Sequence, residues 1–193
     1  MTVSASGAVP GPDGGLRCPW GVSTPDYLAY HDDEWGRPVR GERGVFERLT
    51  LEAFQSGLSW LTILRKRPAF RRAFDDFDAA AIAAYDSSDV TRLLADASIV
   101  RNRAKIEATI ANAHAVLALE EGLHSLVWRH APARHPAPIS IADVPAVTTE
   151  STALAKALRA NGFRFVGPTT SYALMQAVGV VNDHLLDCVA RAD

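Results

Sequence analysis

The sequence predicts an all-α fold, and three observations support this class. Apolar residues recur at three- and four-residue spacing in several segments, as they do on one face of a helix. Residues that cap or end helices stand at the borders of these segments. No segment shows a convincing strand pattern, and no internal repeat is present. With 193 residues and 48% hydrophobic content, the chain can bury the core of one globular domain.

The N-terminal part divides into a tail and a helical pair. Residues 1–16 are rich in Gly, Pro and Ser and cannot offset the entropy of ordering, so we expect a disordered tail before a domain at residues 17–193. From Val45, apolar residues follow helical spacing until the "SG" at 56–57 interrupts them before "LSWLTILRKR". This pattern predicts a helix, a tight loop and a second helix.

A further helical pair is predicted in the middle of the chain. Ser88 fits the N-cap of a short helix through residues 93–94. After a break, a long amphipathic helix ends near Gly122 and is marked by Ile106, Ile110, Ala113 and Leu117. The two helices form a helix-hairpin-helix pattern with its hairpin at residues 97–103.

The last third of the chain predicts a loop and two helices. Residues 131–147 contain four prolines and should form an ordered loop or linker. Ser151 can cap a helix that stops at the "NG" of 161–162. A final helix from Tyr172 to Val189 then carries "NDHLLDC".

Composition excludes several classes of protein. The longest apolar runs fall far short of the roughly 18 residues of a membrane span, and no signal-peptide pattern opens the chain, so we expect a cytoplasmic protein without a membrane. A net charge of −2 argues against nonspecific coating of nucleic acid. It leaves room for a local basic face, suggested by Arg65, Lys66, Arg67, Arg71, Arg72, Arg101, Arg103 and Lys105.

The two cysteines of the chain each have a histidine nearby. His184 and Cys188 are four residues apart, a spacing that places both on one face of a helix, and Cys18 is followed by His31. Together they supply the ligand types of a tetrahedral Cys₂His₂ metal site. Alternatively, the cysteines are unrelated buried thiols and the histidines lie on the surface. A third interpretation is a hydrolase in which His184 activates the Cys188 thiolate.

Aromatic side chains crowd the stretch from Cys18 to Trp60, namely Trp20, Tyr27, Tyr30, Trp35 and Trp60. Isolated aromatics usually pack in a core, but several of these stand in loop-like sequence, which favours a stacking pocket. Glu52 lies at the edge of the apolar stripe that begins at Val45. It is either an ordinary boundary carboxylate or one that lines the aromatic pocket and neutralises a cationic ligand.

Three stretches carry a resemblance to a known family. "CPWGVSTPDYLAYHDDEWGRP", "LEAFQSGLSWLTILRKR" and "FRFVGPTTSYALMQAVGVVNDHLLDC" together resemble DNA-3-methyladenine glycosylase I of bacteria, from about Cys18 to Cys188. The resemblance implies a helix-hairpin-helix DNA glycosylase fold with two helical lobes, the second made from the terminal segments. It also implies one structural zinc ion per chain that staples these segments through Cys18, His31, His184 and Cys188.

The activity that this resemblance implies is the flipping and hydrolytic removal of 3-methyladenine from double-stranded alkylated DNA by a monomer. It places Glu52 as the catalytic residue at the polar edge of the base, with a pocket of Trp20, Tyr27, Tyr30 and Trp60. Leu58 is the candidate wedge, and Arg101 and Arg103 are candidates for the DNA backbone. The hairpin departs from the family because Ser98 and Ala104 replace its usual glycines. A zinc-stapled nucleic-acid-binding module without catalysis is the alternative function.

Overall fold

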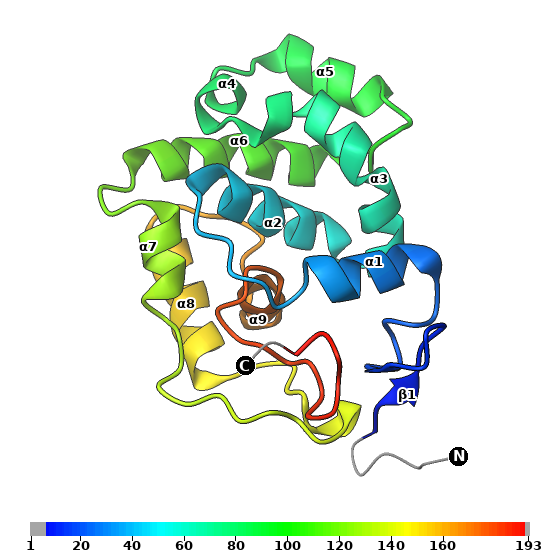
Figure 1. The fold of residues 1–193 in the computed structure, drawn as a ribbon. Coiled ribbons are helices and arrows are strands. Elements are labelled where there is room, and N and C mark those ends of the chain that lie inside the picture. The colour runs from blue at the N-terminus through cyan, green and yellow to red at the C-terminus, as the bar shows by residue number, and fades with distance from the viewer. Residues whose placement is uncertain (1–6, 192–193) are drawn as a thin grey trace.

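The structure is a computed structural model that describes residues 7–191, and these residues are mostly helical (Figure 1). In chain order the helices are α1 (Pro25–Asp33), α2 (Glu42–Gln55), α3 (Trp60–Ala73), α4 (Ala79–Ala83), α5 (Ser87–Ala95), α6 (Arg103–Ala118), α7 (Leu123–Trp128), α8 (Thr149–Ala160) and α9 (Pro168–Ala177). Short 3₁₀ turns occur at η1 (Asp75–Phe77) and η2 (Ile141–Asp143). The predicted all-α class is therefore correct apart from one small sheet.

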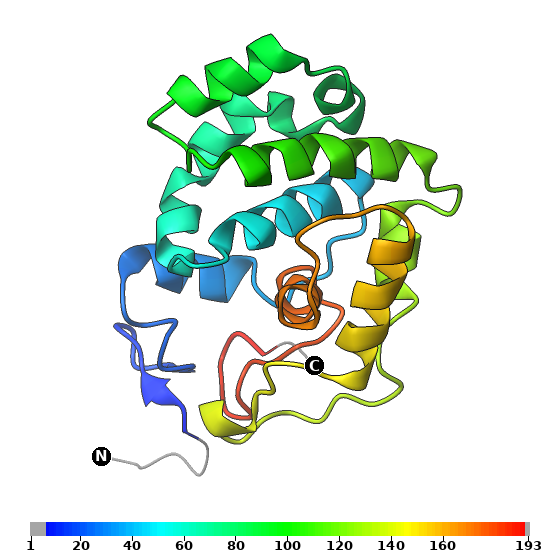
Figure 2. The ribbon, with the colours of Figure 1, turned by 180° about the vertical axis from the view of Figure 1, so that it is seen from behind.

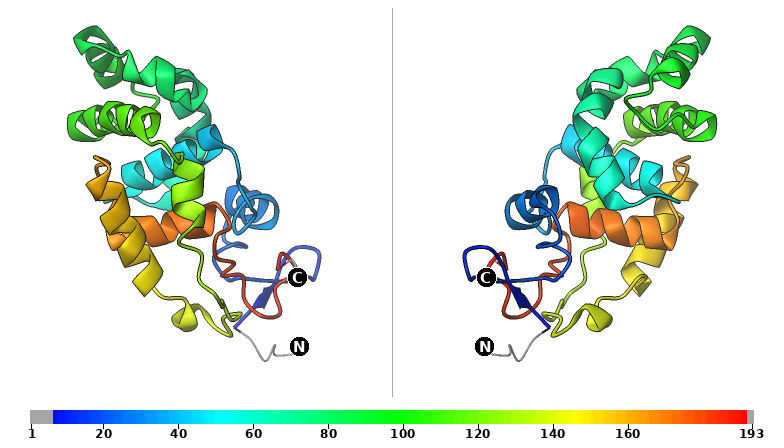
Figure 3. Two further views of the ribbon diagram at one scale, coloured as in Figure 1. Left: turned by 90° about the vertical axis from the view of Figure 1, so that its left-hand side faces the viewer. Right: turned by 90° about the vertical axis from the view of Figure 1, so that its right-hand side faces the viewer.

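Helix α2 is the centre of the main core. It packs against α3, α6, α7 and α9, and its buried side chains include Phe46, Leu49 and Phe54. Helices α4 and α5 pack on α6 at the end of the molecule far from the termini, while α8 packs on α9 nearer to them (Figures 2 and 3). The main core therefore extends from the helices α4, α5 and α6 to the helices α8 and α9. The contact between α2 and α9 joins residues that are far apart in the sequence.

A second, smaller core joins the two terminal segments. The antiparallel strands β1 (Val9–Pro10) and β2 (Leu16–Arg17) form a two-stranded sheet. Its apolar cluster consists of Ala8, Cys18, Leu185, Cys188 and Ala190. The expectation of disorder over residues 1–16 therefore fails for residues 7–16, because β-pairing and the Gly7 N–H donated to the Ile139 carbonyl (2.8 Å) hold them. Residues 1–6 lie outside the described part of the chain.

The predicted α2–α3 and α5–α6 pairs are both present, with small shifts at their ends. Asp86, not Ser88, caps α5, because its carboxylate accepts the N–H groups of Ser88 and Asp89. Helix α6 ends at Ala118 instead of near Gly122. Gly122 has a φ of +78° and opens α7, a helix that was not predicted.

Caps also shift in the C-terminal third. The Ser151 side chain takes part in the cap of α8, but Thr148 is the N-cap residue, since its hydroxyl accepts the Ser151 N–H at 3.1 Å. Residues 131–147 form the expected ordered connection, and η2 lies within it. Helix α8 ends at Ala160 with Asn161 as its C-cap, which agrees with the predicted stop.

The predicted final helix is wrong beyond Ala177. Helix α9 ends there, and residues 178–191 form turns and loops. The cause is Gly179, whose φ of +72° turns the chain and whose Cα faces the Arg37 carbonyl so closely that an added Cβ would lie 2.5 Å from the carbonyl carbon. His184 and Cys188 are therefore not on a helix. Over residues 7–191, no helix combines the length and hydropathy that crossing a membrane requires.

Candidate active site and metal centre

An aromatic cavity of about 240 Å³ opens between α1, α2, α3 and α9. Its lining contains every residue that the sequence proposed for a base pocket: Trp20, Tyr27, Tyr30, Glu52 and Trp60. Three further lining residues, Gln55, Ala173 and Gln176, were not predicted, and a fourth, Trp35, belonged to the predicted aromatic cluster but was not assigned to the base pocket. Segments separated by more than a hundred residues in sequence therefore build one site.

Helix α1 places two of the aromatic rings. Thr24 accepts the Tyr27 N–H and caps the helix, and Pro25 at its first position fixes a helical φ. Tyr27 and Tyr30, three residues apart, then share one face. The Tyr27 hydroxyl accepts the Leu61 N–H at 3.0 Å, which ties α1 to the first turn of α3.

The aromatic rings that line the cavity contact one another in tilted and edge-on arrangements. Tyr30 and Trp60 have centroids 5.4 Å apart at 50°. Trp20 meets Tyr27 edge-on at 5.6 Å and Trp35 edge-on at 4.9 Å. Such contacts stabilise the ring positions in the absence of a ligand, so the cavity is preorganised.

Glu52 is the unusual polar group of the cavity. Its residue is 6% exposed, and no donor of residues 7–191 hydrogen-bonds its carboxylate. Burial, the sole cause, raises the pKa of Glu52 from 4.5 to about 8. Burial, followed by the nearby Glu52 charge, also raises the pKa of Tyr30. The cavity therefore contains a carboxyl group whose negative charge, when it ionises, is offset by no group of residues 7–191.

Two of the missed residues had detectable signals. Gln55 is three residues after Glu52 on α2, so helical spacing alone places it on the same face. Trp35 belongs to the aromatic cluster that the sequence analysis identified, but it received no role. Gln176 had no such signal, because its position depends on how α9 packs against α2.

Leu58 lies in the tight loop that joins α2 to α3. Gly57 in this loop has a φ of +85°, and Leu58 is 41% exposed. Leu58 lines a second hollow of about 330 Å³ that shares Glu52, Gln55 and Ala173 with the aromatic cavity. The apolar side chain of Leu58 is therefore exposed next to the candidate site. An exposed apolar side chain does not stabilise the fold.

The connection between α5 and α6 places the arginines of the predicted hairpin in solvent. Arg101 is exposed and makes no ion pair within residues 7–191, whereas Arg103 pairs with Glu107 at 3.3 Å. Asn102 caps α6 by accepting the Lys105 N–H at 3.1 Å. Neither Ser98 nor Ala104 has a positive φ, so the backbone does not need the missing glycines in this conformation.

The predicted basic face is smaller than the sequence indicated. Carboxylates from other segments pair with Arg65, Arg67 and Arg71, and Glu107 on the same helix pairs with Arg103. Lys66 donates to the carbonyls of Ala97 and Ser98, and Lys105 is buried. Arg72 and Arg101 are the two members of the set for which the described residues provide no hydrogen-bonded partner.

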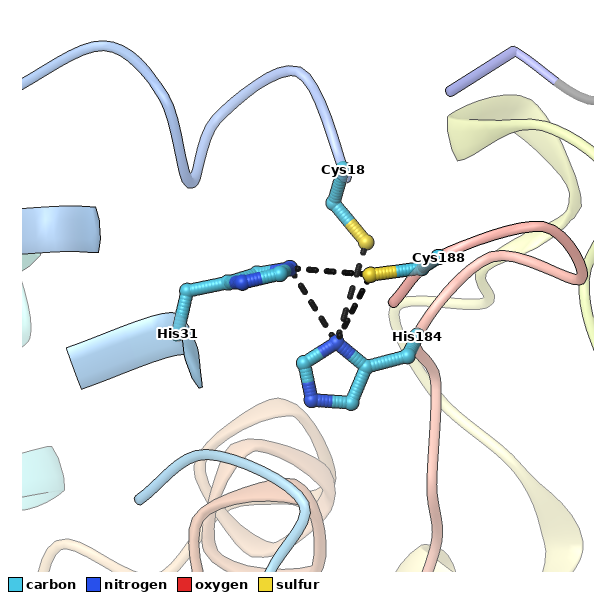
Figure 4. Close-up of side chains that lie close together, drawn as sticks. All are labelled: Cys18, His31, His184 and Cys188. Atoms are coloured by element: carbon cyan, nitrogen blue, oxygen red, sulfur yellow. Dashed lines mark hydrogen bonds between the residues drawn. The ribbon is translucent and has the colours of Figure 1, made fainter. Parts of the chain in front are cut away.

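Cys18, His31, His184 and Cys188 converge in the small core between the termini (Figure 4). All four are buried, and their ligand atoms lie within 4.8 Å of one another. His31 Nε2 is 3.1 Å from His184 Nδ1, and Cys188 Sγ is 3.5 and 3.6 Å from these two nitrogens. A tetrahedral zinc site with ordinary bond lengths has separations of about 3.3 Å between nitrogens and about 3.6 Å between nitrogen and sulfur. The geometry fits a metal ion.

The neighbours of both imidazoles fix which nitrogen faces the cluster. His31 Nδ1 lies 2.7 Å from the Asp32 carboxylate, and His184 Nε2 lies 3.0 Å from the Trp35 carbonyl. Each acceptor requires the N–H on its own side, which leaves the lone pairs of His31 Nε2 and His184 Nδ1 facing each other. The two nitrogens are 3.1 Å apart, so their lone pairs repel unless a metal ion or an added proton lies between them.

The two thiols support the same interpretation. Cys188, and then burial, raise the pKa of Cys18, whereas contacts with Cys18 and the two imidazoles lower the pKa of Cys188. Without a metal ion, ionisation of one thiol therefore opposes ionisation of the other. A divalent cation removes this opposition because it stabilises both thiolates. The alternative hydrolase finds no support here, because Cys188 and His184 point into the cluster and neither lines the aromatic cavity.

Comparisons with known proteins agree on one family. The sequence model of the methyladenine glycosylase family matches residues 20–192. DNA-3-methyladenine glycosylase 1 of Escherichia coli (strain K12) is 45% identical over 178 residues, which cover 89% of this chain and 95% of that protein. The Haemophilus influenzae DNA-3-methyladenine glycosylase is 43% identical over 181 residues, 91% of this chain and 97% of that protein.

Solved structures give the same result. A crystal structure of 3-methyladenine DNA glycosylase I superimposes with a TM-score of 0.87 at 44% identity and covers 91% of this chain and all of that one. A variant of 3-methyladenine DNA glycosylase I in complex with 3-methyladenine superimposes with a TM-score of 0.85 at 33% identity, covering 91% of this chain and 97% of that one.

Proposed function

The chain belongs to the methyladenine glycosylase family, and we infer that it is a base-excision-repair glycosylase that removes 3-methyladenine from alkylated DNA. One observation carries this inference for the site itself. Glu52, a buried carboxyl group for which residues 7–191 provide no hydrogen-bond donor, lines a cavity walled by aromatic rings. Such a cavity suits a flat, positively charged base, and methylation at N3 gives adenine that charge.

Recognition combines stacking and charge. In this proposal the base stacks on Tyr30 and Trp60, which line the cavity, and cation–π contact with desolvated rings is worth about 1 to 2 kcal/mol. Ionised Glu52 pairs with the cationic base in the same desolvated space. In the empty cavity at neutral pH, Glu52 is mostly protonated, so a neutral base meets a neutral carboxyl group and gains no ion pair. Selection for the charged base follows from this difference.

Cleavage then needs little further help from the protein. The bond between C1′ and N9 breaks with its electron pair moving to N9, so the base leaves as a neutral molecule. Water adds to C1′ and loses a proton. Because the positive charge already weakens this bond, Glu52 has to hold and orient the base, and a strong general base is less necessary than for a neutral leaving group.

DNA binding uses the surface next to the cavity. We assign Leu58 as the wedge that fills the stack after the base flips, since it is exposed beside the hollow that adjoins the cavity. The α5–α6 pair is the helix-hairpin-helix unit, and Arg101 with the N–H groups at the start of α6 contacts the phosphates of double-stranded DNA. We further propose that the protein acts as a monomer in the cytoplasm.

Zinc is the metal that we assign to the Cys₂His₂ cluster. Cys18, His31, His184 and Cys188 would hold it with no open position for water, which is the arrangement of a structural site. Its chemistry there is to neutralise two thiolates and to stabilise the contact between the terminal segments. Arg17 supports the cluster indirectly, because it donates to Asp32 at 3.0 Å and so fixes the acceptor of His31.

The test is to incubate the purified protein with methylated duplex DNA and to identify the released bases by chromatography. We expect 3-methyladenine among them, and Glu52→Gln should release it more slowly while binding the duplex equally well. Binding without release of any base would instead support the alternative of a non-catalytic nucleic-acid-binding module.

A further inference from the structure

The orientation of one amide in the cavity is fixed by its neighbour. Gln176 Nε2 lies 2.7 Å from Asp183 Oδ2. A carboxylate accepts hydrogen bonds but cannot donate them, so the nitrogen and not the oxygen of the amide must face Asp183. The amide carbonyl Oε1 has no hydrogen-bond partner within residues 7–191, and half-buried Gln176 lines the cavity.

Asp183 is itself held firmly. It is 2% exposed, and its Oδ2 also accepts the Tyr172 hydroxyl at 2.7 Å. Its other oxygen, Oδ1, lies 2.8 Å from Nε2 of His135 in the loop of residues 131–147. With these contacts satisfied, rotation of the Gln176 amide would bring two oxygens together and lose a charge-assisted hydrogen bond. The amide therefore has one stable orientation.

We propose that Asp183 is a positioning residue that makes Gln176 a hydrogen-bond acceptor in the cavity, and that Gln176 thereby selects purines with an amino group at C6 over those with an oxo group. Glu52, when ionised, is an acceptor as well. A 6-amino group can donate to such a wall, whereas a 6-oxo group presents its own lone pairs to it. This inference rests on the proposed function and extends it from the charge of the base to its exocyclic group.

The experiment compares two free bases that differ only at C6, 3-methyladenine and 3-methylhypoxanthine. Their dissociation constants are measured through the fluorescence of the cavity tryptophans, for the wild type, Gln176→Met, Asp183→Asn and His135→Ala. Methionine keeps the length of Gln176 but removes its acceptor. Asparagine can donate to the amide carbonyl, so it permits the opposite orientation of Gln176.

We expect the wild type to prefer 3-methyladenine, and Gln176→Met to reduce this preference by roughly tenfold, the value of one hydrogen bond in a desolvated site. Asp183→Asn should reduce it similarly without changing any residue of the cavity wall. His135→Ala is the matched control, because it removes a bond to Asp183 Oδ1 and leaves Oδ2 with Gln176, so the preference should stay within about twofold.

An unchanged preference in Gln176→Met, or in Asp183→Asn if the first variant does not fold, would overturn the proposal. An equal loss in His135→Ala would also overturn it, because general loosening would then explain the effect. Excision of 3-methyladenine from methylated duplex by the wild type is measured in parallel. If that activity is present, a failed preference test rejects the role of Gln176 alone; if it is absent, the proposed function fails first.

Discussion

Replacing Glu52 with glutamine should stabilise the empty protein increasingly as the pH rises. The pKa of Glu52 is 4.5 in the unfolded chain and about 8 in the folded one. Between these values the folded state binds a proton that the unfolded state has lost, so stability is full below pH 4.5 and falls as the pH rises towards 8. Glutamine does not titrate and removes this loss.

The magnitude follows from the shift. Each pKa unit corresponds to about 1.4 kcal/mol, so ionisation of Glu52 costs the fold about 3 kcal/mol at pH 7 and about 5 kcal/mol above pH 8. The amide costs a smaller and constant amount, because it is neutral at every pH. The difference in unfolding free energy between Glu52→Gln and the wild type should therefore shift by about 3 kcal/mol in favour of the variant from pH 4.5 to pH 7.

Urea denaturation of both proteins at several pH values between 4.5 and 8.5 measures this difference. Glu107→Gln is a suitable control, because Glu107 is an exposed glutamate on α6. A difference that stays constant within about 0.5 kcal/mol over this range would refute the argument. It would mean that water or a neighbouring group solvates the carboxylate, and that the cavity is not the desolvated space described above.

The same shift predicts that kcat/KM for 3-methyladenine excision rises with pH, by up to tenfold per unit below about 8, because the ionised carboxylate pairs with the cationic base; a flat profile in single-turnover assays contradicts this. A duplex with neutral hypoxanthine should be cleaved at least about a hundredfold more slowly at pH 8, and comparable excision would show that shape governs selection. Metal analysis of protein purified without chelator should find about one zinc per chain, and Cys188→Ser should lose it and melt earlier; metal-free wild type would reject the site. Lys105→Met should cost about 2 to 3 kcal/mol in urea denaturation, because the Lys105 ammonium donates to the carbonyls of Phe54 (2.9 Å) and Ser56 (2.6 Å) at the end of α2. Lys66→Met, which removes exposed contacts of the same kind, should cost under about 1 kcal/mol, and equal costs would contradict the role of burial.

Local patterns predicted the helices whose ends are marked in the sequence. The apolar spacing after Val45 and the break at 56–57 defined α2 and α3, because glycine at a positive φ ends a helix whatever surrounds it. Helix α1 was missed although Thr24 and Pro25 form an ordinary helix start, because its aromatic and acidic residues gave no apolar stripe.

Long-range contacts decided the parts that failed. The predicted extension of α9 passed over Gly179, whose positive φ ends the helix, and what requires a glycine there is the close approach of the Arg37 carbonyl, a contact that no local pattern reports. His184 and Cys188 were paired because they were expected on one face of a helix. The four ligands do converge, but a loop and not a helix brings this pair together. Gln176 could not be identified from the sequence, because its partner Asp183 lies in the loop after α9 and only the folding of that loop brings the two side chains together.

The Cys₂His₂ cluster also sets an order of events during synthesis. His31 and His184 are separated by 153 positions, and Cys18 and His184 by 166. At translation rates of about 5 to 20 residues per second, roughly 8 to 30 seconds pass between the synthesis of the first histidine and the second. The ribosome exit tunnel delays the second half further. A nascent or truncated chain that lacks the second pair carries only two of the four ligands, so the proposed ion could be held by the full set only after His184 and Cys188 have been synthesised.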